Sequence, residues 1–346
     1  MKVRSLARSL AMIAATLAFL VVLPMSVQSA ETVTLKVADS VPPTHYFAAQ
    51  GLKPWMDRVV QLSKTKVEFQ YYPSEQLGKL ADMVNILKTG VADVAMMSPT
   101  ALAGDFPIGC FFALPGLFEH TVDTNNYLAK MLKEGPLMSE FTNKGFRPVI
   151  PFALPNYEIF TAKKSIVTAE DLKGQKIRSS GAVMGNVLKT LGASPVIMSS
   201  ADLMVGMQRG TVDGTVFAYL SAKAYRVEEV AKYATVGANL SSSFQAYAIS
   251  EKAWQKLPDD VQKAMVQADK EILDAVIKYQ DKETLNIIAD FEKNGVKINR
   301  LSKDEVARWS RAVAPLMDEW EKDMEKKGLG KEAKMMVDAY KKAPGR

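Results

Sequence analysis

The sequence predicts an α/β protein of two lobes with a long helix near its C-terminal end. Three observations favour this fold class. Strand-like and helix-like patterns alternate twice along the chain, a mostly helical part follows them, and the 346 residues are enough for two hydrophobic cores. The hydrophobic content of 48% is ordinary for a globular protein.

The first alternating part covers about residues 33–97. Apolar and polar residues alternate over 33–38 and 67–72, which predicts two strands, and the apolar run 91–97 predicts a third, buried one. Helical patterns over 45–62 and 80–87 lie between these strands. Strands that alternate with helices in this way indicate a parallel sheet covered by helices.

The second alternating part repeats this order. Thr168 and Asp171 have the spacing of a capping box, and Gly174 ends that single turn. We expect helices over 183–191 and 199–210 and strands over 148–152, 157–161, 176–179, 195–198 and 212–217, the last with a turn at 213–214.

The third part is helical. Pro258 suits a first helical turn and Asn294 suits a helix end, with almost no helix breaker between them. A helix of that length spans roughly 50 Å, which exceeds the width of one lobe. It therefore either joins two lobes or breaks near residues 280–282. Further helices are expected over 304–327 and 331–342.

Residues 1–30 have the layout of a secretory signal peptide. Lys2, Arg4 and Arg8 precede an apolar run over 11–23, and small residues follow Pro24. We expect cleavage near residue 29 or 30, with an uncleaved anchor as the alternative. No cysteine follows the run, so no lipid anchor is expected. Subtracting the three basic residues from the net charge of +6 leaves +3, and no basic cluster suggests nucleic acid as a partner.

The sequence lacks the usual signatures of catalysis. His45 and His120 are the only histidines, Cys110 is the only cysteine, and none has the spacing of metal ligands. There is also no nucleophile elbow and no phosphate-binding loop. We therefore expect no enzyme, no cofactor and no metal, and a buried Cys110 thiol. An enzyme with scattered carboxylates is the alternative.

Arg178 is the leading candidate for binding a ligand. It lies at the end of the strand expected over 176–179, and the small residues 179–181 separate it from the next helix. Ligands of doubly wound sheets bind at the carboxyl ends of strands, and a guanidinium fits a carboxylate with two parallel hydrogen bonds. The alternative is a surface arginine paired with an acid.

Several motifs, in order, resemble one family. Residues 171–178 read DLKGQKIR, which is similar to the "DLKG-x-KIR" signature of TRAP transporter solute receptors of the C4-dicarboxylate-binding (DctP) type. Five further segments resemble the family: YPSEQLG at 72–78, LPGLF at 114–118, LGASPV at 191–196, QRGTVDG at 208–214 and AWQKLPDDV at 253–261.

The resemblance implies a periplasmic binding protein with two α/β lobes joined by crossing strands and braced by the long helix. We expect lobe I to comprise 31–154 plus 244–282, and lobe II 155–243 plus 283–346, with the ligand cleft between them. The resemblance also implies delivery of a small organic acid anion to the small and large membrane subunits of a TRAP transporter. A sensory protein with the same fold is the alternative from another class.

The family's carboxylate-binding arginine corresponds to Arg178. Two departures concern the ligand: Phe217 replaces a polar contact, and Tyr157 stands near the place of a second arginine. We therefore expect an aromatic or otherwise apolar monocarboxylate held beside an aromatic wall of Tyr157, Phe217 and Tyr219. A C4-dicarboxylate or keto acid is the alternative. The loops that carry His45, Tyr46 and Ser98 are expected to face the cleft.

Overall fold

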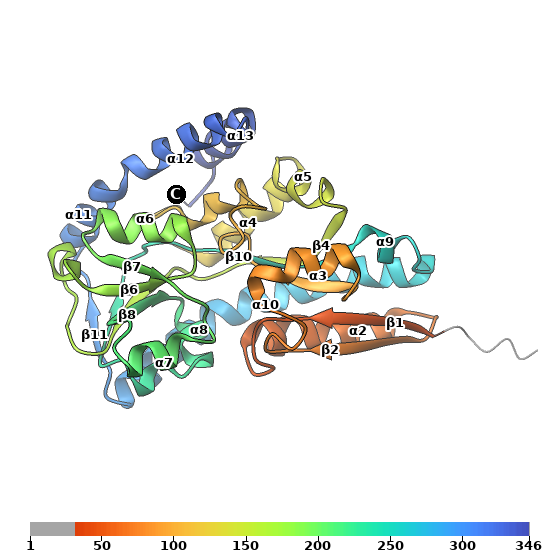
Figure 1. The fold of residues 1–346 in the computed structure, drawn as a ribbon, viewed down its shortest axis with the longest axis horizontal. Helices are drawn as coiled ribbons and strands as arrows, with labels where there is room; N and C mark the ends of the chain where they lie inside the picture. The colour runs from red at the N-terminus through yellow and green to blue at the C-terminus, as the bar shows by residue number, and fades with distance from the viewer. Residues whose placement is uncertain (1–31, 346) are drawn as a thin grey trace, which may run out of the picture. The chain divides into compact units, whose positions relative to one another are not determined.

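The computed structural model describes residues 32–345, which belong to one compact unit with two β-sheets covered by helices (Figure 1). The predicted signal peptide lies outside the described residues. Within them, no helix is both long enough and apolar enough to cross a membrane.

The first sheet is mixed, with the strand order β2-β1-β3-β10-β4. Strand β1 pairs in parallel with β2 and β3, as predicted for this part. Strand β10 is antiparallel to both β3 and β4, so the expectation of a purely parallel sheet is wrong on this side. The bounds are Val33–Ala38 (β1), Val67–Tyr72 (β2), Val94–Met97 (β3), Phe146–Ala153 (β4) and Phe244–Ser250 (β10).

The second sheet has the order β11-β9-β5-β8-β6-β7 and is mixed as well. Strand β6 is parallel to β7 and β8, while β5 is antiparallel to β8 and β9. The bounds are Glu158–Thr161 (β5), Lys176–Ser179 (β6), Ser194–Ile197 (β7), Gly214–Phe217 (β8), Tyr233–Val236 (β9) and Lys297–Arg300 (β11).

The helices agree with the predicted patterns at most positions. The helix expected from residue 45 begins as a π-helix, Phe47–Leu52, before α2 continues it. The shorter helices, some of which were not expected from the sequence, are Lys53–Leu62 (α2), Met83–Thr89 (α3), Thr121–Lys133 (α4), Leu137–Thr142 (α5), Ala182–Thr190 (α6), Leu203–Gln208 (α7), Tyr219–Ala224 (α8) and Glu251–Trp254 (α9).

The long helix α10, Asp259–Lys293, runs without a break, so of the two alternatives the joining helix is correct (Figure 1). It packs against α2 and β4 on the side of the first sheet and against α8 and β11 on the side of the second. Gln280 is fully buried midway, where its Nε2 donates to the carbonyl oxygen of Ala153 at 3.0 Å. The helix is thereby fixed to the segment that leaves the first sheet.

Two segments cross side by side between the sheets. One follows β4 and the other precedes β10. The backbone N–H of Leu154 donates to the Ser243 carbonyl, and the N–H of Tyr157 donates to the Ser241 carbonyl, each at 2.8 Å. The Ser242 hydroxyl also donates to the Leu154 carbonyl at 2.7 Å. The backbone in this crossing is therefore hydrogen-bonded although it belongs to neither sheet.

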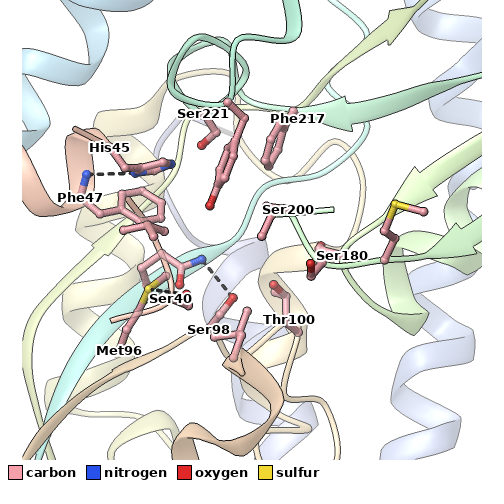
Figure 2. A pocket seen from close by; sticks show the side chains of 18 of the residues that line it. Ser40, His45, Phe47, Met96, Ser98, Thr100, Ser180, Ser200, Phe217 and Ser221 are labelled. Carbon is pink, nitrogen blue, oxygen red and sulfur yellow. Dashed lines mark hydrogen bonds between the residues drawn. The ribbon is translucent and has the colours of Figure 1, made fainter. Parts of the chain in front are cut away.

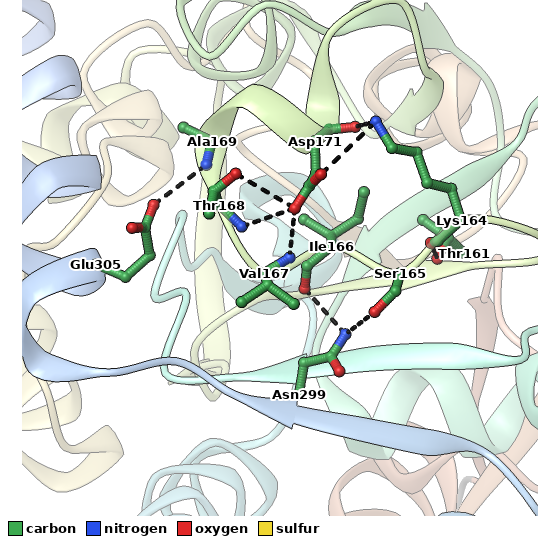
Figure 3. Close-up of polar contacts among 10 residues, drawn as sticks. All are labelled: Thr161, Lys164, Ser165, Ile166, Val167, Thr168, Ala169, Asp171, Asn299 and Glu305. Carbon is green, nitrogen blue, oxygen red and sulfur yellow. Dashed lines mark hydrogen bonds and ion pairs between the residues drawn. The ribbon is translucent and has the colours of Figure 1, made fainter.

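The predicted capping box is present and is linked to the C-terminal part of the chain (Figure 3). The Asp171 carboxylate accepts from the backbone N–H of Thr168 at 2.9 Å, and these bonds lower the pKa of Asp171. Glu305 accepts from the N–H of Ala169, and Asn299 donates to the Ser165 hydroxyl. Strand β11 and helix α11 (Lys303–Val313) are thus held against this turn.

The C-terminal helices are Lys303–Val313 (α11), Pro315–Lys326 (α12) and Gly330–Lys341 (α13). The single helix expected over 304–327 is divided because Pro315 begins a new helix. The Tyr127 hydroxyl on α4 donates to the Met336 carbonyl on α13 at 2.6 Å. Helix α4 lies in the segment predicted for lobe I, and α13 lies in the segment predicted for lobe II, so this hydrogen bond connects the two predicted lobes. The exact lobe boundaries stay a prediction.

Candidate ligand-binding site

A cavity of about 320 Å³ lies between the two sheets and is lined by residues of both (Figure 2). Small-molecule sites are usually about 300–1,000 Å³, so its size suits a small ligand. Its lining gathers at the carboxyl ends of strands, as the sequence predicted. The segments after β1, β3, β6, β7 and β8 contribute to it, together with the start of the antiparallel strand β10.

Arg178 on β6 is the central charged group of the cavity. Its side chain is buried, with a residue exposure of 2%, and its Nε donates to the Met198 carbonyl at 2.9 Å. One terminal nitrogen donates to the Ser200 hydroxyl at 2.9 Å, while the other, Nη1, has no partner. Burial lowers the pKa of Arg178 to about 10, so it stays cationic at neutral pH. No carboxylate among the described residues forms an ion pair with it.

A cluster of three aromatic rings adjoins this guanidinium through Phe217. The Phe217 ring centroid lies 5.1 Å from the guanidinium carbon, which is cation–π distance. Tyr157 meets Phe217 edge to face at 6.3 Å, and Tyr225 stacks on Phe217 at 5.7 Å. Burial raises the pKa of Tyr157 to about 12, so its hydroxyl stays protonated. The cationic group is thus held in an apolar, aromatic part of the cavity.

Two of the predicted site residues do not line the cavity. Tyr219 belongs to the core of the second sheet, where its ring packs on Phe160 and Phe291 and its hydroxyl donates to the Thr235 carbonyl. The chain turns into α8 at Tyr219, and this turn directs the ring away from the cavity. Tyr46 is buried, and its ring packs against His45, Phe47 and Phe152. The expected aromatic wall therefore contains Tyr225 instead of Tyr219.

His45 and Ser98 do line the cavity, from the side of the first sheet (Figure 2). Burial lowers the pKa of His45 to about 3, so this ring is neutral. Its Nδ1 accepts from the backbone N–H of Phe47 at 3.2 Å, which leaves the proton on Nε2. Ser98 accepts a hydrogen bond from the Gln245 side chain at 3.1 Å.

The lining residues carry few other charges. Lys79 lies at the edge of the cavity with its side chain 66% exposed, and its Nζ is 2.9 Å from Glu75. In the part of the chain that the structure describes, no three His, Cys, Asp or Glu side chains are placed to hold a metal ion. Glu75 also lines the cavity, with its side chain 9% exposed, so Arg178 is the buried cation of the described lining.

The segment 156–158 stands where some family members are expected to have a second arginine. Its side chains here are either uncharged or already hydrogen-bonded within the protein. The Asn156 amide donates to the carbonyls of Phe118 and Glu119. Glu158 is buried in the second sheet, where it accepts from Thr235 and from backbone N–H groups. Of this segment, Tyr157 faces the cavity.

Tyr225 and Gln245 also line the cavity and were not identified from the sequence. Tyr225 caps the C-terminal end of α8, one helical turn after Ser221, which also lines the cavity. Gln245 had one available signal: it is the only amide in the apolar strand Phe244–Ser250.

The two halves of the cavity wall touch at the chain segment that follows Arg178. Gly181 approaches the backbone of Thr100 so closely that a Cβ atom on Gly181 would lie 2.4 Å from the Thr100 carbonyl oxygen. The φ of Gly181 is −172°, which any residue can adopt. Glycine is therefore required here for space and not for backbone conformation.

Comparison with known proteins agrees with this geometry. The model of the family "bacterial extracellular solute-binding protein, family 7" (DctP) matches residues 38–323. A solute-binding protein of Albidiferax ferrireducens is 25% identical over 297 residues, covering 83% of this chain and 86% of the relative. The C4-dicarboxylate-binding periplasmic protein DctP of Rhodobacter capsulatus is 27% identical over 305 residues, covering 84% and 87%.

Solved structures share the fold. A TRAP solute-binding protein from Rhodoferax ferrireducens, in complex with copurified benzoate, superposes with a TM-score of 0.81 at 24% identity, over 90% of this chain and 99% of that one. A marine metagenome TRAP protein specific for aromatic acid ligands, with 3-hydroxybenzoate, gives 0.83 at 24% identity over 90% and 99%. The family match covers most of the chain, and it confirms the resemblance and the two-lobed α/β fold inferred from the sequence. The chain belongs to the bacterial extracellular solute-binding proteins of family 7, the DctP family of TRAP solute-binding proteins.

Proposed function

We propose that this chain is the solute receptor of a TRAP transporter and that it binds an aromatic or otherwise apolar monocarboxylate through Arg178. The observation that carries the proposal is the buried guanidinium with one unpartnered terminal nitrogen beside three aromatic rings. A ligand carboxylate supplies the missing partner, and its apolar body contacts the rings.

An anionic ligand follows from the cost of a buried charge. A cation in an apolar cavity without a counter-ion is unfavourable, and a hydrogen-bonded carboxylate removes most of that cost. Arg178 is buried and its protein partners are a carbonyl and a hydroxyl, both uncharged. The fork geometry of the guanidinium also favours a carboxylate over a single-atom anion.

A single carboxylate follows from the other lining residues. His45 is neutral, and Lys79 is exposed and already paired with Glu75. A second buried carboxylate would therefore lack a cationic partner and would cost several kcal/mol. Tyr157, Phe217 and Tyr225 instead offer ring faces and edges to an apolar group. Related structures of this fold hold benzoate, 3-hydroxybenzoate or mandelate.

The proposed mechanism is a closure of the two lobes on the ligand. The carboxylate binds Arg178, and residues that follow strands of the first sheet, including His45 and Ser98, cover the ligand from the opposite side. Closure excludes water and strengthens the ion pair because the effective dielectric constant falls. The membrane subunits of the transporter then recognise the closed form and not the open form. We further propose export by the segment 1–30 and action in the periplasm, without turnover of the ligand.

The test is a calorimetric titration of the mature protein with benzoate, mandelate and succinate. Because a ligand that binds only the folded state raises its melting temperature, a thermal-shift series provides a second readout. Binding of an aryl acid at least tenfold tighter than succinate supports the proposal. A preference for succinate would overturn the ligand class and favour the dicarboxylate alternative. Chemical change of the bound acid during incubation would indicate an enzyme.

A further inference from the structure

Gln245 has an unsatisfied polar atom in the cavity wall. The residue is 5% exposed, at the start of β10, and the β10–β4 pairing is irregular between Gln245 and Tyr247. Such irregularities redirect a side chain at functional sites. The Gln245 Nε2 donates to Ser98, but Oε1 has no partner although it is buried.

His45 adds a donor to the same wall. Its Nδ1 is occupied by the Phe47 N–H, so the proton-bearing Nε2 is the atom available to other groups (Figure 2). The side of the cavity opposite Arg178 therefore offers an acceptor from Gln245 and a donor from His45. A ligand with a purely hydrocarbon body would leave the Gln245 acceptor buried and unpaired, which is unfavourable.

We propose that the ligand carries a hydroxyl group on its apolar body and that this hydroxyl donates a hydrogen bond to Oε1 of Gln245. The inference rests on the proposed function, because it assumes that the carboxylate is held by Arg178. Gln245 is then a specificity-determining residue: it selects hydroxylated aryl acids over their unsubstituted analogues.

A hydroxyl fits this position better than other small polar groups. It is neutral, so it needs no counter-ion, and it can both donate and accept. If the oxygen and nitrogen of the Gln245 amide exchange places, the NH₂ group becomes the unpaired group, and a ligand hydroxyl accepts a hydrogen bond from it instead. A site built to bond a ligand hydroxyl discriminates strongly against an analogue that lacks it, because the protein group is then left unpaired.

The experiment measures dissociation constants for benzoate, the three hydroxybenzoates, mandelate and, as size-matched analogues without a donor, the fluorobenzoates. The wild-type protein is compared with Gln245→Met, which keeps the side-chain length but removes both polar atoms. Gln267→Met, at an exposed position of α10, is the matched control. A melting curve checks that each variant is folded.

We expect at least one hydroxylated acid to bind the wild type about tenfold tighter than benzoate and the matching fluorobenzoate. In Gln245→Met the preference for the hydroxylated acid over benzoate and the matching fluorobenzoate should fall to about twofold or less. If the wild type binds hydroxylated and unsubstituted acids equally, the role of Gln245 is overturned while the proposed function stands. The same holds if Gln245→Met keeps the preference for the hydroxylated acid. Failure of every aryl acid to bind the wild type would overturn the aromatic ligand class of the proposed function as well. If Gln245→Met does not fold, the wild-type series still decides.

Discussion

Replacing Gly181 by alanine tests whether the contact between the two halves of the cavity wall is part of the ligand-bound form. The added methyl group would lie 2.4 Å from the Thr100 carbonyl oxygen, and real Cβ atoms essentially never come closer than 3.0 Å. The segments must therefore separate by at least 0.6 Å at this point. The atom that the methyl group would meet is a backbone oxygen, so the clash cannot be relieved by moving a flexible side chain.

The separation should weaken ligand binding more than it weakens the fold. Inserting a methyl group into a tightly packed contact costs about 1–3 kcal/mol. If the ligand-bound form keeps this contact, that cost reduces affinity by about fivefold to about 150-fold. The ligand-free protein can avoid the clash by opening, so its melting temperature should change little.

The assay is a titration of wild type and Gly181→Ala with the tightest-binding aryl acid, together with melting curves with and without ligand. Gly185→Ala, on the helix α6 that Gly181 precedes, is the matched control, because its Cβ would meet only ordinary contacts at 3.6 Å or more. The control should bind like wild type. Wild-type affinity of a folded Gly181→Ala protein would refute the idea that closure brings these segments together.

Three further outcomes are expected. Burial raises the pKa of Asp39 from 3.8 to about 6, so its protonated form stabilises the folded state fully below about pH 4, and this stabilisation is lost as the pH rises through 6. Between pH 4 and 7 the unfolding free energy of the wild type should therefore fall by about 2.5 kcal/mol relative to Asp39→Asn in urea titrations, and parallel pH profiles would contradict this. Cys110 is 2% exposed and burial raises its thiol pKa to about 12, so it should react with a disulfide reagent at pH 8 only after unfolding; rapid reaction of the folded protein would contradict its burial. Phe217→Leu should weaken aryl acid binding about twofold to about 30-fold through the lost cation–π contact with Arg178, whereas Phe217→Tyr should not, and equal affinities of the two variants would argue against that contact.

The position of Arg178 could be predicted because its determinants are local. A strand, small residues and a helix follow one another in the sequence, and this order places the last strand residues at the ligand-binding edge of a sheet. The length of α10 was predictable for a similar reason, since its apolar repeat and both of its ends lie in one continuous segment.

Other parts of the site depend on contacts between distant segments. Strand β10 is buried along nearly its whole length, so no alternation marks it, and it pairs with β4 almost 100 residues earlier. Gln245 reaches the cavity only through that pairing. Tyr219 was misplaced because a single turn at Ala218 decides whether the ring faces the cavity or the core. Tyr225 depends on the same short helix.

The most direct test of the central claim is a binding titration of Arg178→Ala and Arg178→Lys with an aryl monocarboxylate. Two charge-assisted hydrogen bonds to a carboxylate, at about 1.5–3 kcal/mol each, predict at least about a 100-fold loss of affinity for the alanine variant. Lysine keeps the charge but not the fork, so an intermediate loss is expected. A cooperative melting transition must show that both variants are folded. A folded Arg178→Ala protein that binds the acid within about threefold of wild type would contradict the assignment of Arg178 as the carboxylate-binding residue.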